Sequence, residues 1–465
     1  MIIAPLSLPL RLTLGLAIAG QLLVLLGIVG AVGAWFFLPL GVIVILAVRG
    51  TKMRWQPLIA APPLVALALY PPIAFDETLY HLPMVRAIAR SGAIRFFSDL
   101  RWPVFPELQE LLCVPLFLAF GDTATHLVAV VEIVLLAGIV FEWGGWLAAA
   151  LVLGNPIVMQ IGSVTYVEAA LMLFVAAGFY CLDREWPVLA GFLLGTACSV
   201  KYLGLYFAAA GLIYAWRKAP RYLPGLAAGM LPMYGVITYL GGNPVFPFFG
   251  STAWNPHLVH AGGNAWRLFR DITFARQHVN WQPPYSPLFA VSLLITLIAA
   301  TRNRKAAFAA AVCVGYIAIF MFLPQDSRYL LPLLPLASVI AAKAVPRKHV
   351  AAISLIAILP GFAYAGYRVI KQGLPPMNAV QRRAYLERHI PEYRALEHRG
   401  AGVIYVCGAE QLKYYGGDDL AGEVIGPYTS MPANTRYLLI SRGKCAAPPG
   451  FQRIYADSAA ELWRR

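Results

Sequence analysis

The stretch Pro57–Pro83, PLIAAPPLVALALYPPIAFDETLYHLP, decides the fold. An apolar run that ends at Ile73 is followed at once by two adjacent carboxylates, Asp76 and Glu77. The apolar run at 57–73 is long enough to cross a lipid bilayer, and the carboxylates lie where the chain returns to water. This placement fits either a solvated helix end or the chemical centre of an integral-membrane enzyme.

The composition is that of a membrane protein. Hydrophobic residues make up 59% of the 465 residues, charged residues make up 13%, and the mean hydropathy is +0.66. Apolar runs of roughly 15–22 residues recur along the chain, which is the length that a helix needs to cross a bilayer. The run at 10–30 is interpreted as a spanning helix and not as a signal peptide, because a second run at 33–48 follows directly. The sequence therefore predicts an all-α polytopic membrane protein.

The basic residues indicate the orientation of the chain. The formal net charge of +15 would favour nucleic acid in a soluble domain, but here much of it lies in short loops between apolar runs. Such loops face the cytoplasm, so no nucleic-acid partner is expected: Arg49/Lys52/Arg54, Arg217/Lys218/Arg221, Arg302/Arg304/Lys305 and Arg347/Lys348. About thirteen crossings follow, at 10–30, 33–48, 57–73, 123–142, 146–160, 165–182, 187–199, 202–215, 222–240, 285–300, 306–323, 328–345 and 350–369. The N-terminus is then cytoplasmic, and Asp76 and the C-terminus are external.

Residues 74–122 are predicted to form one large external loop. The parity of the crossings requires the apolar segment Pro106–Phe120 to stay out of the membrane, and its two glutamates, its glutamine and its proline are costly in lipid. We expect two interfacial helices in this loop, roughly at 79–91 and 107–119. Four arginines of this loop are exceptions to the rule that basic residues concentrate on the cytoplasmic side. Either an anionic ligand or lipid headgroups would explain them: Arg86, Arg90, Arg95 and Arg101.

The chain is predicted to divide into a transmembrane domain, 1–369, with a second external loop at 241–284, and an external C-terminal domain, 370–465. From about residue 370 the composition becomes mixed and polar. Asn378–Arg399 has the pattern of an amphipathic helix that is interrupted at Pro391. Short strand-like runs follow at Val403–Val406, Tyr437–Ile440 and Gln452–Tyr455, which indicates a small α/β domain. Cys407 and Cys445 lie in this tail and are either free or disulfide-bonded.

Several ionisable residues gather at the external ends of the predicted spans. Glu168 follows the break at Asn155-Pro156, Lys201 interrupts a long apolar stretch, and Arg328 begins a span. A lysine or an arginine at such a position suits an anion, especially a phosphate, although snorkelling of Lys201 and pairing of Arg328 with Asp326 are simpler readings. His81 lies one helical turn after Glu77 and could relieve the repulsion between the paired carboxylates. The remaining histidines of interest are interpreted as polar loop residues: His257, His260 and His278.

The order of these motifs resembles the GT-C superfamily of polyprenyl-phosphate-sugar-dependent glycosyltransferases, in the branch with protein O-mannosyltransferases and the lipid A aminoarabinose transferase. The resemblance covers most of residues 57–345. It rests on the following ordered set: Asp76-Glu77, Phe105-Pro-Glu-Leu-Gln-Glu110, Asn155-Pro156, Tyr166-Val-Glu168, Lys201-Tyr202, Gly242-Asn-Pro-Val-Phe-Pro247 and Arg328-Tyr329. The chain departs from the family in having Glu168 where aspartate is more common, and in the two extra spans at 10–48.

The resemblance implies roles for these residues. Asp76 would be the general base, Glu77 its neighbour, and Glu168 the second acidic group. Lys201 and Arg328 would meet the donor phosphate, and the predicted donor site also includes Arg86, His81 and Tyr329. A divalent cation is an optional partner, with Asp76, Glu77, His81 and Glu168 as its candidate ligands.

The predicted function is that of an inverting glycosyltransferase, hexosyl or pentosyl, of the bacterial inner membrane. It would move a sugar from a polyprenyl-phosphate donor to a lipid, glycan or protein acceptor at the external face. A carboxylate would take the acceptor proton, and cations would stabilise the departing phosphate. A secondary transporter is the main alternative, but transporters commonly show two related halves, and no internal repeat is visible. An O-antigen polymerase or ligase is a further alternative, although the acidic first loop argues against it.

Overall fold

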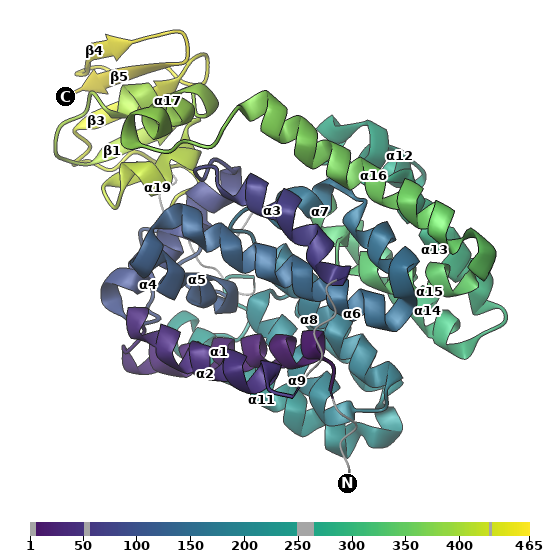
Figure 1. The fold of residues 1–465 in the computed structure, drawn as a ribbon. Helices are drawn as coiled ribbons and strands as arrows, with labels where there is room; N and C mark the ends of the chain where they lie inside the picture. The colour runs from purple at the N-terminus through teal and green to yellow at the C-terminus, as the bar shows by residue number, and fades with distance from the viewer. Residues whose placement is uncertain (1–5, 51–55, 249–264, 427–429) are drawn as a thin grey trace.

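The computed structural model describes residues 6–50, 56–248, 265–426 and 430–465. Most of this part of the chain is helical, and a small sheet lies at one corner of the helical body (Figure 1). The helices are α1 (Leu8–Val29), α2 (Phe37–Val48), α3 (Ala61–Ala68), α4 (Leu82–Ser91), α5 (Leu108–Phe120), α6 (His126–Leu153), α7 (Pro156–Ile161), α8 (Glu168–Asp183), α9 (Pro187–Val200), α10 (Gly204–Tyr214), α11 (Ala219–Gly241), α12 (Ala265–Phe274), α13 (Pro287–Ala300), α14 (Arg304–Phe320), α15 (Leu333–Ala344), α16 (Arg347–Gln372), α17 (Ala379–His389), α18 (Tyr393–Leu396) and α19 (Lys413–Gly416).

The predicted spans coincide with helical segments of the structure. Helix α6 is kinked at Gly145, which has φ +78°. The part of α6 before this kink corresponds to the span at 123–142, and the part after it, together with α7, corresponds to the span at 146–160. By length and composition, four described helical segments can cross a membrane, and they are Leu8–Val29, Asp122–Leu153, Trp216–Gly241 and Arg347–Gln372. The other apolar helices are shorter, so the count of thirteen crossings and its orientation stay predictions.

Glycines bring α9 and α11 into close contact. A Cβ on Gly195 would lie 2.4 Å from the Leu226 carbonyl oxygen, and a Cβ on Gly229 would lie 2.4 Å from the Phe192 carbonyl oxygen. At Gly191 and Gly225 a Cβ would lie only 2.1 Å from a carbonyl oxygen of the other helix. The two glycines of each helix are four residues apart, which is the small-residue spacing that lets membrane helices pack backbone against backbone. This pairing fixes the end of α9, where Lys201 lies.

Most of helix α5 is buried among other helices. Leu108 to Pro115 are all buried, and this segment packs against α1 and α4, whereas Phe120 is 72% exposed. The helix was predicted at 107–119, so its bounds are confirmed. Both faces of its first two turns are covered by other helices, and its position at the membrane interface stays a prediction.

The C-terminal region contains a five-stranded sheet. The strands are β1 (Ile404–Cys407), β2 (Leu420–Gly422), β3 (Tyr437–Ser441), β4 (Gln452–Ala456) and β5 (Ala460–Arg464), in the order β2-β1-β3-β5-β4. β1 pairs in parallel with β2 and β3, and β5 pairs antiparallel with β3 and β4. Helices α17 and α18 match the predicted amphipathic helix with its break at Pro391.

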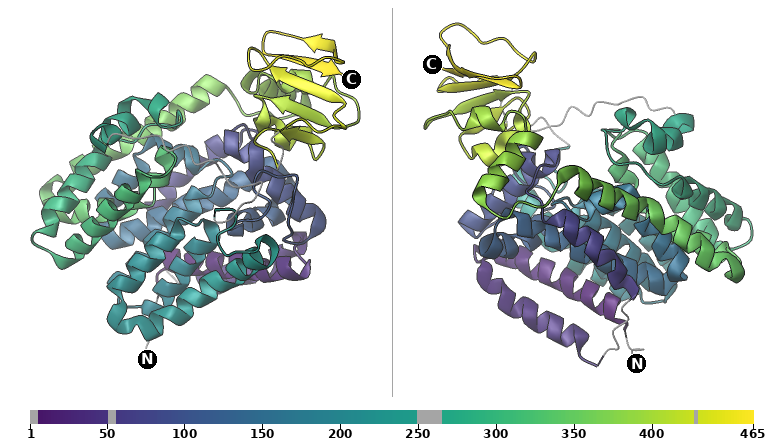
Figure 2. Two further views of the ribbon diagram at one scale, coloured as in Figure 1. Left: turned by 180° about the vertical axis from the view of Figure 1, so that it is seen from behind. Right: turned by 45° about the horizontal axis from the view of Figure 1, so that its top comes forward.

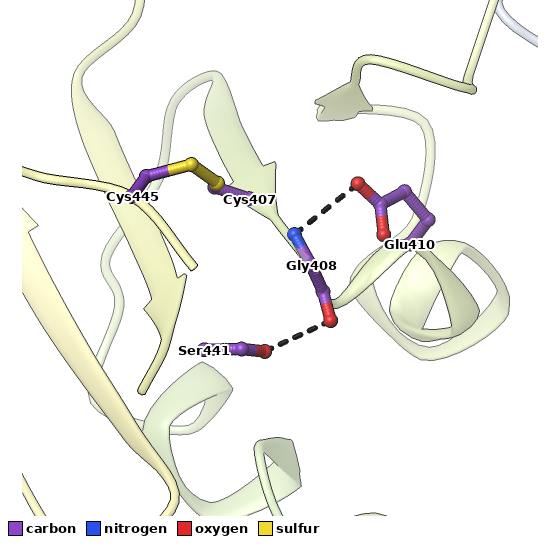
Figure 3. The surroundings of a disulfide bond; sticks show 5 residues. All are labelled: Cys407, Gly408, Glu410, Ser441 and Cys445. Atoms are coloured by element: carbon purple, nitrogen blue, oxygen red, sulfur yellow. Dashed lines mark hydrogen bonds between the residues drawn. A yellow bond between two sulfur atoms is a disulfide. The ribbon is translucent and has the colours of Figure 1, made fainter. Parts of the chain in front are cut away.

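A disulfide joins Cys407 at the end of β1 to Cys445 after β3 (Figure 3). Their Cα atoms are 6.4 Å apart. Beside the disulfide, the Ser441 hydroxyl donates to the Gly408 carbonyl oxygen at 2.9 Å, and the Gly408 amide donates to Glu410 at 3.3 Å. Of the two alternatives that the sequence left open for these cysteines, free or disulfide-bonded, the structure contains the disulfide.

The sheet region contacts the helical body beside α4, and the views from behind and from above show it standing off one edge of the helices (Figure 2). Arg86 on α4 donates to the Tyr414 carbonyl oxygen at 2.6 Å, and Arg90 bonds Asp418 at 2.6 Å. The Tyr415 hydroxyl donates to the Pro72 carbonyl oxygen at 2.5 Å. The C-terminal region thus holds the segment that leads into Asp76.

Candidate active site

The candidate site is assembled around the side chain of Arg328, which is 5% exposed. Arg328 lies in a short 3-10 helix, Ser327–Leu330, just before α15, and Asp76 lies just before a π-helical turn, Glu77–His81. Glu168 is the first residue of α8, and Lys201 follows the last residue of α9. Four segments that are distant in sequence therefore bring the predicted charged groups together.

Ion pairs connect these groups directly. The Arg328 Nη2 atom donates to the Asp76 Oδ2 atom. The Arg328 Nε atom is 2.8 Å from the Asp326 carboxylate and 3.6 Å from the Glu168 Oε1 atom. Lys201 Nζ donates to the same Glu168 oxygen at 2.7 Å. Two cations thus face three carboxylates in one cluster, here called the Arg328 cluster: Asp76, Glu168, Lys201, Asp326 and Arg328.

Aromatic rings line the Arg328 cluster. The Arg328 guanidinium carbon lies 4.7 Å from the centre of the Tyr166 ring, and Lys201 Nζ lies 4.2 Å from the centre of the Tyr329 ring. The Tyr80 hydroxyl donates to the Asp76 Oδ2 atom at 2.9 Å. Cation–π contacts hold a guanidinium or an ammonium group without neutralising its charge. Tyr329, which was among the predicted donor-site residues, therefore lies beside the cluster together with Tyr80 and Tyr166.

The environment of Asp76 favours its charged form. Burial alone would raise the pKa of this carboxyl, but Arg328, with smaller contributions from His81 and the Tyr80 hydroxyl, brings the pKa below its ordinary value. Asp326 behaves differently. Burial raises the pKa of Asp326, and Arg328 opposes this rise only in part. Asp76 is therefore the carboxylate of the pair that stays ionised over the wider pH range.

Glu77 lies apart from the Arg328 cluster and has other partners. It is fully buried, and its Oε1 atom is 2.7 Å from His126 Nε2 and accepts from the Thr165 amide at 2.7 Å. Burial would raise the pKa of Glu77, but these partners, His126 first, hold it below its usual value. Glu77 thus ties the acidic loop to α6 and to the turn before α8.

His81 helps to lower the pKa of Asp76, as the prediction of a basic neighbour implied, but it does not contact Glu77 one turn before it. His81 Nδ1 lies 2.5 Å from the Glu110 Oε1 atom, and both side chains are buried. The prediction assumed an ordinary α-helical turn, but residues 77–81 form a π-helical turn, which changes the direction of each side chain. The His81 ring still lies near the cluster, since its centre is 5.7 Å from that of the Tyr166 ring.

Arg86 lies at the contact with the C-terminal region described above. It also lies 3.6 Å from Asp418, and its guanidinium carbon is 5.2 Å from the centre of the Tyr414 ring. These contacts explain its burial without a ligand. Of the predicted phosphate-binding residues, the structure therefore brings Lys201, Arg328 and Tyr329 together and places Arg86 elsewhere.

A group of buried acids beside the site was not among the predicted residues. Glu132 on α6 accepts from the Gln109 amide at 3.1 Å, and Glu107 is fully buried. Burial, and secondarily the nearby Glu110, raise the pKa of Glu107 well above its ordinary value. The signal for Glu132 was present in the sequence, since it lies inside the predicted span at 123–142 and ionisable residues in such spans face partners. The partner of Glu77, His126, carried the same signal, because it lies inside the same predicted span.

The candidate metal ligands do not form a metal site in this arrangement. Among the described residues, no group of three or more His, Cys, Asp or Glu side chains could hold a metal ion. Glu77 is bonded to His126, His81 to Glu110, and Glu168 to Lys201. These donors do not fit a divalent cation, and no step of the chemistry below uses one.

The segment 241–284, predicted to be a second external loop, is described only in part. His257 and His260 lie outside the described residues. His278 is 3.3 Å from Asp271 and half exposed, as a polar loop residue would be. At the start of the loop, the Tyr202 hydroxyl donates to the Phe246 carbonyl oxygen at 2.6 Å. The segment after Gly242 is therefore tied to the residue that follows Lys201.

Comparisons with known proteins identify the fold. No family model and no curated protein matches the sequence. Among solved structures, the apo form of ArnT from Cupriavidus metallidurans matches with a TM-score of 0.58 and 14% identity, covering 88% of this chain and 96% of that chain. The chain has the ArnT fold. The form of that ArnT bound to undecaprenyl phosphate matches with a TM-score of 0.54 and 13% identity over the same shares of both chains. ArnT is a GT-C lipid A aminoarabinose transferase, so the predicted resemblance is confirmed at the level of the fold.

Proposed function

We propose that this protein is an integral-membrane glycosyltransferase that moves a sugar from a polyprenyl-phosphate donor to a hydroxyl or phosphate group of an acceptor. The observation that carries the proposal is the Arg328 cluster, in which an ionised carboxylate and two buried or half-buried cations meet on an ArnT fold. In the bound form of the Cupriavidus ArnT, the fold holds undecaprenyl phosphate. A polyprenyl phosphate is thus the donor carrier that fits both the fold and the cations.

The residues of the cluster divide between two tasks. Asp76 is held in its charged form, so it can accept the proton of an acceptor hydroxyl as the oxygen attacks the anomeric carbon. Lys201 and Arg328 supply the positive charge that the departing lipid phosphate requires. A single displacement of this kind inverts the configuration at the sugar.

The existing ion pairs prepare the site for a phosphate. Glu168 orients both cations, since the same Oε1 atom accepts from Lys201 and lies 3.6 Å from Arg328. Arg328 has a buried Nη1 atom that no group among the described residues accepts from, and Lys201 is 22% exposed. Both cations therefore keep donors for an incoming anion while their positions are fixed. Preorganised charge of this kind costs little reorganisation during the reaction.

We also propose the placement of this site at the external face of the bacterial inner membrane. In that arrangement residues 74–122 form an external loop, and residues 1–369 and 370–465 form the membrane domain and an external C-terminal domain. The contacts of Arg86 and Tyr415 with opposite sides of this division support a C-terminal domain that braces the acidic loop.

Two measurements test the proposed function. The purified chain in proteoliposomes should release polyprenyl phosphate from a lipid-linked sugar, and it should do so only when an acceptor is present. Mass spectrometry of envelope glycans and glycoproteins, with and without the intact gene, should reveal an acceptor that loses one sugar. Transport of a solute across the proteoliposome membrane without sugar transfer would contradict the proposal and favour the transporter.

A further inference from the structure

A second charged pocket lies at the other end of the helices that carry the Arg328 cluster. Helix α8 begins at Glu168 in the cluster and ends 15 residues later at Asp183. At 1.5 Å per residue this separates the two carboxylates by roughly 22 Å along the helix axis. Helix α9 runs back from Pro187 to Val200, next to Lys201. The surroundings of Asp183 are therefore separate from the candidate active site.

Asp183 collects donors from three other helices. Lys305 at the start of α14 lies 2.5 Å from its Oδ1 atom, and Lys343 near the end of α15 lies 3.9 Å from its Oδ2 atom. The indole N–H of Trp143 on α6 donates to Oδ2 at 3.1 Å. One carboxylate thus holds two ammonium groups close together. Because both lysine side chains are about half exposed, each keeps N–H donors that face outward.

Two adjoining cavities open at this point. One, of about 90 Å³, lies between α8, α14 and α15 and has apolar walls that include Phe179 and Phe308. The other, of about 230 Å³, reaches Arg217 and Lys218. Lys305 and Asp183 line both. The two cavities together are lined by four basic residues and two acidic ones, so their charge is positive overall.

An exposed tryptophan and an exposed isoleucine indicate that this pocket lies at a membrane surface. Trp216 lines the larger cavity and is 66% exposed, and Ile213 in the preceding turn is 69% exposed. Tryptophan is enriched where a membrane protein passes from hydrocarbon to headgroups. Basic pockets between helices at that level bind anionic lipid headgroups.

We propose that the two cavities beside Asp183, here called the Asp183 pocket, bind the headgroup of an anionic phospholipid. Its phosphate would lie between Lys305 and Lys343, where it relieves the repulsion of two ammonium groups on one carboxylate, and an acyl chain would follow the apolar wall. Asp183 positions the two lysines and does not itself bind the lipid. This site does not depend on the proposed transfer reaction, since it lies at the opposite end of α8.

Titration of the full-length, delipidated protein with phosphatidylglycerol or phosphatidylcholine, followed by native mass spectrometry, tests this site. Lys305→Gln and Lys343→Gln should each weaken phosphatidylglycerol binding about five-fold, and together roughly 25-fold, because each removes about one charge's worth of attraction. Lys348→Gln is the matched control, since Lys348 is exposed and lines neither cavity. Lys305→Arg, which keeps the charge, should bind as the wild type does.

The alternative outcomes are distinct. Equal binding of the two lipids by the wild type would overturn the proposal, and this comparison does not require any variant to fold. An equal loss on Lys348→Gln would show a diffuse surface effect and would also overturn it. Displacement of phosphatidylglycerol by inorganic phosphate at comparable concentration would assign the pocket to free phosphate instead of a lipid.

Discussion

Replacing Asp76 with asparagine should abolish transfer and leave the protein folded. The variant keeps the shape of the side chain but cannot accept a proton, and loss of a general base typically costs about 10²–10⁴-fold in turnover. Removal of one partner of a buried ion pair often costs about 3–5 kcal/mol because the other charge is left uncompensated. Here Arg328 keeps Asp326 at 2.8 Å and Glu168 at 3.6 Å. The loss should therefore stay within that of one charge-assisted hydrogen bond, about 1.5–3 kcal/mol.

The matched control is Asp326→Asn. It removes a negative charge that also neighbours Arg328. The asparagine oxygen can still accept the hydrogen bond that the Arg328 backbone amide donates to Asp326 at 3.2 Å. Neither substitution removes a cation, and both make the cluster less negative, so donor binding should be unchanged or tighter in both. Only Asp76→Asn should lose turnover. Equal loss in the two variants would show that the effect is electrostatic and that Asp76 is not the base.

The pH dependence gives a second readout of the same residue. Because the pKa of Asp76 is held below its ordinary value of about 3.9, the base is ionised at all higher pH. Turnover in the wild type should therefore be limited by Asp76 only as the pH falls through that depressed pKa. Arg328→Gln removes the largest stabilising charge while the burial remains, so the pKa of Asp76 should rise and the acid limb should move to higher pH. Near-normal transfer by purified Asp76→Asn protein in reconstituted membranes would refute the whole assignment.

Three further predictions follow from the same contacts. Lys201→Ala and Arg328→Ala should each weaken use of the lipid-linked donor by about 10- to 150-fold, because each loses one phosphate contact of about 1.5–3 kcal/mol. The affinity for the acceptor, measured separately, should stay nearly unchanged. If both variants bind the donor as the wild type does, the phosphate site lies elsewhere. Glu77→Gln should lower the free energy of unfolding by about 1.5–3 kcal/mol at pH 7, because a charged hydrogen bond to buried His126 is lost. The wild type should lose the same contribution as the pH falls through the depressed pKa of Glu77. The control is Glu461→Gln, which removes an exposed ion pair and should be as stable as the wild type. A cysteine at Phe120, which is 72% exposed, should react with a membrane-impermeant reagent added from the external side, against a background of four buried free cysteines; labelling only from the cytoplasmic side would overturn the topology of residues 74–122.

The helices could be predicted from the sequence because lipid and core burial both require apolar residues in long runs. The predicted helix at 187–199 and the helix α9, Pro187–Val200, agree within a residue, since Trp186-Pro187 and Lys201 punctuate the run at both ends. The strands β2 and β5 were missed for a different reason. β2 has three residues, and it is defined by its parallel pairing with β1 and not by a local pattern. Its partner is known only when the chain has folded.

The members of the candidate site were also predictable one by one, but their pairings were not. Charged residues in apolar surroundings are rare, so Lys201, Glu168 and Arg328 stand out in the sequence. Which carboxylate meets which cation depends on the packing of α8, α9 and the segment before α15. The glycine spacing of α9 and α11 is a sequence signal of this packing, and it sets the position of Lys201. Such spacing predicts that two helices meet, but the register between them comes from the tertiary structure.

The adjacent carboxylates show how local geometry decides function. Side chains of consecutive residues in a helical turn point in directions about 100° apart, so Asp76 and Glu77 cannot both face the same partner. One had to enter the interior, where it required a buried donor, and His126 with the Thr165 amide supplies this to Glu77. The other was then free to meet Arg328 at a position where its side chain is 16% exposed. The anchoring of Glu77 and the presentation of Asp76 are thus two results of the same turn, and weakening the first should misplace the second. A Glu77→Gln variant that folds should therefore also lose turnover, with little change in the pH at which its acid limb lies.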